Sequence, residues 1–115
     1  MIDVMSLSPS QRQLLTPIRA ALMPFGASIQ QAFIFGSMAS GTDRPDSDVD
    51  LMVIGDASLA DLYMATGDIQ KEAGRPMHIN THTIAEWESL QSDPIIQAIL
   101  EQPHITVLSN PESNV

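Results

Sequence analysis

The sequence contains no cysteine and few basic residues. Without cysteine the chain can form no disulfide, thiol nucleophile or thiolate metal site. Only five residues are Lys or Arg, whereas 14 are Asp or Glu, so the formal net charge is −9. Because phosphate backbones are bound by clustered basic side chains, this balance argues against an extended nucleic-acid surface and against an anionic membrane as partner.

Long apolar runs are also absent. No stretch approaches the roughly 18–20 apolar residues that cross a bilayer, and the first residues lack the basic segment of a signal peptide. We therefore expect a cytoplasmic protein that makes no membrane contact. The length of 115 residues predicts one domain over residues 1–115, with a core at 8–108 and a frayed tail at 109–115. Hydrophobic residues make up 43%, which excludes a disordered acidic chain.

Hydrophobic periodicity predicts an α/β (α+β) fold, with a small mixed sheet of about four strands and helices packed on one face. The strands are expected at 29–35, 49–54, 77–83 and 104–108. The helices are expected at 9–25, 59–73, 85–90 and 94–101. Pro17 predicts a kink in the first helix, or a second helix capped by Thr16. A polar turn region is expected at 38–47.

Four Asp residues fall within eight positions, at 43, 46, 48 and 50. Asp43 and Asp46 are typical of turn formers. Asp48 and Asp50 enter an apolar strand one residue apart, so their side chains project to the same face. Such a carboxylate pair, with coordination positions left for water, suits Mg2+ or Mn2+. The alternative for an isolated Asp-x-Asp is a solvated strand end.

Gly36 and Ser37 follow the preceding apolar strand. A glycine and a hydroxyl at a strand end let backbone amides approach phosphate oxygens closely, although a lone Gly-Ser is more often a turn. Combined with Asp48 and Asp50, they predict a site for a metal and a triphosphate group. Arg44 is a candidate to neutralise phosphate, with a salt bridge to a nearby Asp as the alternative.

Gly36-Ser37, ten intervening residues and Asp48-Val49-Asp50 together resemble the signature of the minimal nucleotidyltransferases of the DNA polymerase β superfamily. The likeness extends over most of residues 14–108. It implies a polymerase β palm-like fold and transfer of a nucleoside monophosphate from an NTP to an acceptor, with release of pyrophosphate. It also implies that Asp48 and Asp50 bind Mg2+ and that Gly36 and Ser37 hold the phosphates.

The sequence departs from this family at one position. Active members usually supply a third carboxylate from the neighbouring strand, and here His78 occupies that place. A neutral histidine can act as a base near pH 7 but is a poorer Mg2+ ligand than a carboxylate. His78 is therefore the third catalytic candidate.

Two functions follow from the resemblance. The first is transfer of AMP from ATP to an acceptor hydroxyl, on a partner protein such as a HEPN-type toxin, as in similar antitoxins. The second is a catalytically weak or inactive nucleotide-binding module that regulates through partner binding. A chain of this size is also compatible with a homodimer.

Overall fold

The computed structural model describes residues 7–42, 44 and 47–109. In chain order the elements are α1 (Pro9–Leu22), the 3-10 helix η2 (Met23–Ser28), β1 (Ile29–Phe35), α2 (Gly36–Ser40), β2 (Val49–Gly55), α3 (Leu59–Ala73), β3 (Met77–His82), α4 (Ile84–Leu90), α5 (Pro94–Glu101) and β4 (Ile105–Ser109). No helix in these described ranges is both long enough and apolar enough to cross a membrane.

The four strands form one mixed sheet in the order β3-β2-β1-β4, which confirms the predicted sheet. The β2–β3 pair is parallel, and β1 is antiparallel to both β2 and β4. Residues 32–35 of β1 are a continuous apolar run because this strand lies in the interior of the sheet, between β2 and β4. The end of β1 and the beginnings of β2 and β3 therefore meet at one end of the sheet.

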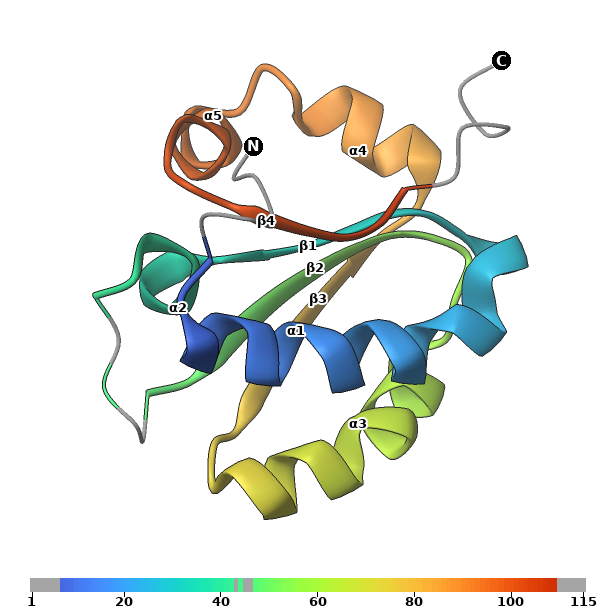
Figure 1. The fold of residues 1–115 in the computed structure, drawn as a ribbon. Coiled ribbons are helices and arrows are strands. Elements are labelled where there is room, and N and C mark those ends of the chain that lie inside the picture. Colours follow the sequence, from blue (N-terminus) through green and yellow to red (C-terminus); the bar gives the residue numbers. More distant parts are fainter. Residues whose placement is uncertain (1–6, 43, 45–46, 110–115) are drawn as a thin grey trace.

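Helices cover both faces of the sheet (Figure 1). Helices α1 and α3 pack on one face over the larger core, where Ile18 and Leu62 are fully buried. On the other face α4 and α5 cover a smaller cluster that includes Phe33 and Ile54, with Trp87 of α4 packed against it. The sequence predicted helices on one face only. A second layer is needed because β1 carries apolar side chains on both faces.

Helix α1 differs from the expectation at Pro17. The structure continues it as one helix through that residue, so the alternative of a second helix capped by Thr16 is wrong. Proline removes one helical hydrogen bond, at a cost of about 3 kcal/mol in a helix interior. The buried stripe of Leu14, Ile18 and Leu22 spans the position and holds both halves against the same core. Beyond α1, η2 runs through Gly26, which was expected to end the helix.

The predicted turn region at 38–47 begins as a helix, α2. Its residues Met38 and Ala39 are buried, and the side-chain amide of Gln11 donates to both of their carbonyl oxygens, at 3.0 and 3.4 Å. Five residues are too few to show helical periodicity, so no local pattern indicated α2. Asp43 and Asp46, predicted as turn formers, lie outside the described residues. The frayed tail was predicted at 109–115. Ser109 belongs to β4, and residues 110–115 lie outside the described residues.

Side chains of α3 hold the outer edge of β3. The hydroxyl of Tyr63 accepts a hydrogen bond from the backbone N–H of Ile79 at 3.1 Å, and the side chain of Gln70 accepts one from that of Met77 at 3.3 Å. These bonds satisfy backbone donors on an edge strand that has no further strand beside it. They also fix the strand on which His78 lies.

Candidate active site

Asp50 lies on β2, directly between two other candidate segments. Its backbone pairs with Phe35 at the end of β1 on one side and with His78 of β3 on the other. The residues flanking Asp50 on β2, Val49 and Leu51, are buried in the larger core. Asp50 itself is half-buried and points to the opposite face. The pairing thus brings together the Gly36-Ser37 segment, the Asp pair and His78.

Gly36 approaches the Asp50 carboxyl group closely. Its φ is +77°, in the left-handed region that favours glycine. A Cβ added at Gly36 would collide with Oδ2 of Asp50 and lie 3.3 Å from its Cγ. The backbone conformation at position 36 therefore favours glycine, and a larger residue there would displace the Asp50 carboxyl group. The glycine of the sequence motif is an integral part of the site.

Asp48 and His78 form a contact at the rim of the site. His78 Nε2 lies 2.9 Å from Asp48 Oδ2, and the two side chains are 60% and 45% exposed. Such an exposed pair contributes about 0–1 kcal/mol to stability, so its main consequence is orientation. The parallel pairing of β2 with β3 places the two residues together.

The backbone that leads into Asp48 is anchored by the segment before β3. Arg75 is buried and its Nε donates to the carbonyl oxygen of Ser47 at 2.8 Å. One residue later, the N–H of Val49 donates to the carbonyl oxygen of Pro76 at 2.9 Å. These two bonds bracket Asp48. Sequence reasoning missed this role of Arg75, because a cation after a helix gives no local sign of a carbonyl partner 28 residues away.

Burial raises the pKa of Asp50 above its ordinary value. His78 lowers this pKa electrostatically, and the neighbouring negative charge of Asp48 raises it further. A cation bound beside this pair of carboxyl groups would offset the negative charge that raises the pKa of Asp50. Their oxygen donors fit a hard divalent ion such as Mg2+, whose remaining ligands are water and phosphate oxygens.

Two carboxylates are all that the described residues offer to a metal. No group of three or more His, Cys, Asp or Glu side chains in the described ranges could hold a metal ion. His78 is near Asp48 but does not complete such a group. Among the described residues, Asp48 and Asp50 are therefore the carboxylates that would hold a cation, whose remaining ligands would come from water and phosphate.

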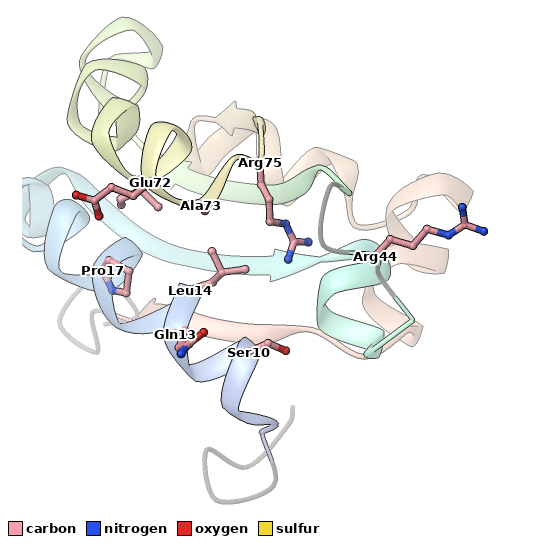
Figure 2. A pocket seen from close by; sticks show the side chains of 9 residues that line it. Ser10, Gln13, Leu14, Pro17, Arg44, Glu72, Ala73 and Arg75 are labelled. Carbon is pink, nitrogen blue, oxygen red and sulfur yellow. The ribbon is translucent and has the colours of Figure 1, made fainter.

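The two remaining predicted site residues, Ser37 and Arg44, lie in different places. Ser37 is half-buried in α2, next to Gly36. Arg44 is exposed and lines a cavity of about 450 Å3 between α1 and the C-terminal end of α3, together with Arg75 and Glu72 (Figure 2). In Figure 2 the Arg44 side chain extends away from the other lining residues. The structure thus brings together Gly36, Ser37, Asp48, Asp50 and His78, and places Arg44 on the wall of this separate cavity.

A second cavity, of about 470 Å3, lies beside the Asp pair. One wall comes from Phe35, Gly36 and Ser40, and the other comes from α5, including Ala98, and from Gln102 directly after that helix. The α5 wall lies about 60 residues after Phe35 along the chain, so no local sequence pattern could have indicated this cavity.

A family model described as polymerase beta, nucleotidyltransferase matches residues 19–108, which is most of the chain. The chain belongs to the polymerase β nucleotidyltransferase family. The matched region includes every candidate site residue, from Gly36 to His78. No curated protein sequence matches the chain.

Solved structures with the same fold come from toxin–antitoxin systems. One is a toxin–antitoxin crystal structure with AMP-PNP, at 14% identity and a TM-score of 0.58, covering 87% of this chain and 77% of that one. Another is a tri-AMPylated Shewanella oneidensis HEPN toxin in complex with its MNT antitoxin, at 12% identity and a TM-score of 0.54, covering 90% and 76%. At these identities the comparison shows the polymerase β nucleotidyltransferase fold.

Proposed function

We propose that the chain is a Mg2+-dependent nucleotidyltransferase that transfers AMP from ATP to a hydroxyl group of a partner protein in the cytoplasm. The observation that carries the proposal is the approach of Gly36 to the Asp50 carboxyl group, with Asp48 and His78 at the rim. The absence of a side chain at Gly36 leaves open space beside the Asp50 carboxyl group, whose pKa is raised by burial, and this arrangement suits a site where phosphate oxygens and a cation meet.

Each side chain has a role in this reaction. Mg2+ or Mn2+, held by Asp48 and Asp50, supplies charge neutralisation for the triphosphate. Gly36 and Ser37 bind the phosphates, because the absence of a side chain at Gly36 leaves their backbone accessible beside Asp50. His78 receives the proton that the acceptor hydroxyl loses, and its contact with Asp48 orients its ring.

The reaction is a single displacement at phosphorus. The acceptor oxygen forms a bond to the α-phosphorus while the bond from that phosphorus to the oxygen bridging the β-phosphate breaks. Pyrophosphate leaves with the electron pair of the broken bond. The acceptor hydroxyl gives up its proton to His78 and becomes a phosphodiester oxygen.

The partner protein is assigned from charge and from structural similarity. A net charge of −9 disfavours nucleic acid as the acceptor. The similar structures include an antitoxin bound to an AMPylated HEPN toxin and a toxin–antitoxin structure with AMP-PNP. We therefore assign ATP as the nucleotide and a HEPN-type protein as the acceptor.

A second function is favoured by one observation. The described residues supply two carboxylates and a histidine where an active member usually has three carboxylates. In this alternative the chain binds Mg2+–ATP and regulates its partner by contact, with little or no transfer. His78→Asp discriminates between the two, because a third carboxylate would raise transfer from a low wild-type level in the second case.

The experiment combines calorimetry with transfer of the α-phosphoryl label. The wild type, Asp48→Ala and Asp50→Ala are titrated with Mg2+–ATP and then incubated with labelled ATP and a HEPN-domain protein as acceptor. Asp68→Ala, which removes an exposed carboxylate of α3, is the matched control.

We expect label transfer by the wild type and by Asp68→Ala, with loss of binding and transfer in the two site variants. Binding without transfer by the wild type would support the regulatory module. Equal binding of Mg2+–ATP by all four proteins would overturn the site assignment in both functions.

A further inference from the structure

The cavity between α5 and the end of β1 is continuous with the candidate phosphate site. Gly36 belongs to both, because it lines the cavity and approaches the Asp50 carboxyl group. Phe35, which pairs with Asp50, forms part of the same wall. A molecule whose phosphates lie beside Gly36 therefore has this cavity as an adjoining space for its uncharged part.

The chemistry of the walls is suited to a flat, uncharged group. The lining includes the ring of Phe35 and the side chains of Ile95 and Ala98, and it contains no charged residue. Two lining side chains, Ser40 and Gln102, can donate and accept hydrogen bonds. Pockets of this kind, mostly apolar with a few polar groups, are typical of small-molecule sites of about 300–1,000 Å3. The volume of about 470 Å3 lies within that range.

Exposure of an apolar side chain in the α5 wall supports the same conclusion. Ile95 is 72% exposed, although α5 packs on the sheet through other residues, including Ile99. Covering Ile95 with a ligand would remove apolar surface from water, at about 25 cal/mol for each Å2 buried. An aromatic heterocycle placed between Phe35 and α5 would do this.

The other large cavity does not compete for this role. It is lined by Arg44, Arg75 and Glu72, and it lies between helices α1 and α3. Those helices pack on the face of the sheet opposite to the one on which Asp50 points. Of these two cavities, only the uncharged one is lined by Gly36.

We propose that the cavity formed by Phe35, Gly36, Ser40 and α5 is the nucleobase subsite and that it selects purine nucleoside triphosphates. A purine has a larger face to bury than a pyrimidine, and Ser40 and Gln102 contact its polar edge. This inference rests on the proposed function, since it names the part of the substrate that lies next to the phosphate site.

The test fills the cavity without altering the phosphate site. Ala98→Trp places a large side chain in the α5 wall, and Ala60→Trp makes the same substitution at an exposed position of α3 as the control. Affinities for Mg2+–ATP, Mg2+–CTP and Mg2+–tripolyphosphate are measured by calorimetry, and circular dichroism verifies folding. Ile95→Ser is the second variant, because it removes apolar contact without adding bulk.

We expect wild-type protein to bind ATP at least fivefold more tightly than CTP. Ala98→Trp weakens ATP binding at least tenfold and leaves tripolyphosphate affinity within twofold, while Ala60→Trp changes neither. Ile95→Ser weakens ATP binding by threefold or more, again without effect on tripolyphosphate.

Three results would overturn the subsite. They are unchanged ATP affinity in both cavity variants, equal loss of ATP and tripolyphosphate affinity, and reduced transfer to the acceptor with unchanged ATP affinity. The last would assign the cavity to the acceptor. If the wild-type protein binds neither ATP nor tripolyphosphate, the proposed function is refuted, and the subsite with it.

Discussion

Gly36→Ala provides a sharp test of the site because the chain offers a matched control. Gly36 and Gly74 both have positive φ values, of +77° and +63°. An alanine in this left-handed region costs about 1–2 kcal/mol at either position. The two glycines differ in their surroundings, since a Cβ at Gly74 meets nothing within 4 Å, whereas one at Gly36 collides with Asp50 Oδ2.

This difference separates stability from binding. At Gly36 the colliding atom is the end of a side chain that can rotate, so the Asp50 carboxyl group moves aside and adds little to the cost of folding. We therefore expect both variants to lose about 1–2 kcal/mol of unfolding free energy. Moving the carboxylate removes it from the place where a cation and phosphate would meet. Gly36→Ala should therefore lose at least tenfold in Mg2+–ATP affinity, equivalent to about 1.4 kcal/mol.

The assay pairs urea unfolding with calorimetric titration of Mg2+–ATP for the wild type and both variants. The prediction is similar unfolding free energies for Gly36→Ala and Gly74→Ala, with weakened ATP binding in Gly36→Ala alone. If Gly36→Ala binds Mg2+–ATP as tightly as Gly74→Ala does, then the approach of Gly36 to Asp50 has no part in nucleotide binding.

Three further predictions concern Asp50 and the scaffold around it. The pKa of Asp50 is raised in the folded chain, so its ionised form destabilises the fold. Asp50→Asn should therefore raise the thermal midpoint at pH 7 in the absence of metal. This gain should vanish below pH 3.8, where the carboxyl group is protonated in both the folded and the unfolded chain. Tyr63→Phe removes the acceptor for the Ile79 N–H and should lower the unfolding free energy in urea by about 0.5–1.5 kcal/mol. Ser8→Ala removes the capping box that Ser8 forms with Gln11 and should cost about 1 kcal/mol in the same assay.

Each of these has a result that contradicts it. A stabilising effect of Asp50→Asn that is the same at pH 3 and pH 7 would mean that charge burial is not its cause. Tyr63→Phe with wild-type stability would show that water replaces the hydroxyl at the edge of β3. A neutral Ser8→Ala would show that packing alone fixes the start of α1.

Much of the fold could be predicted because hydrophobic periodicity and helix caps depend on residues that are close together in the sequence. The strand predicted at 29–35 from the apolar run 32–35, and the strand predicted from the alternation that begins at Met77, became β1 and β3. Ser58 and Gly74 flank α3 as N-cap and C-cap. Helix α2 was missed because it is five residues long and is held by buried Met38 and by Gln11, which is distant in the sequence.

Sequence reasoning also selected residues that the fold brings together at the candidate site. Asp48, Asp50 and Gly36 follow from a short motif, whose spacing the sequence shows directly. The contact between His78 and Asp48 depends on the parallel pairing of β2 with β3, which no local pattern specifies. The cavity against α5 depends on packing between segments about 60 residues apart, and only the folded chain shows it.

The central claim is that the Asp48–Asp50 site transfers a nucleotidyl group. The most direct measurement incubates the chain and a HEPN-domain protein, the proposed acceptor, with Mg2+ and ATP labelled at either the α- or the γ-phosphorus. We predict that α-label appears covalently on the partner, that γ-label leaves as pyrophosphate, and that Asp48→Asn and Asp50→Asn reduce the transfer at least a hundredfold. Transfer of the γ-label, or transfer at wild-type rates by both variants, would contradict the claim.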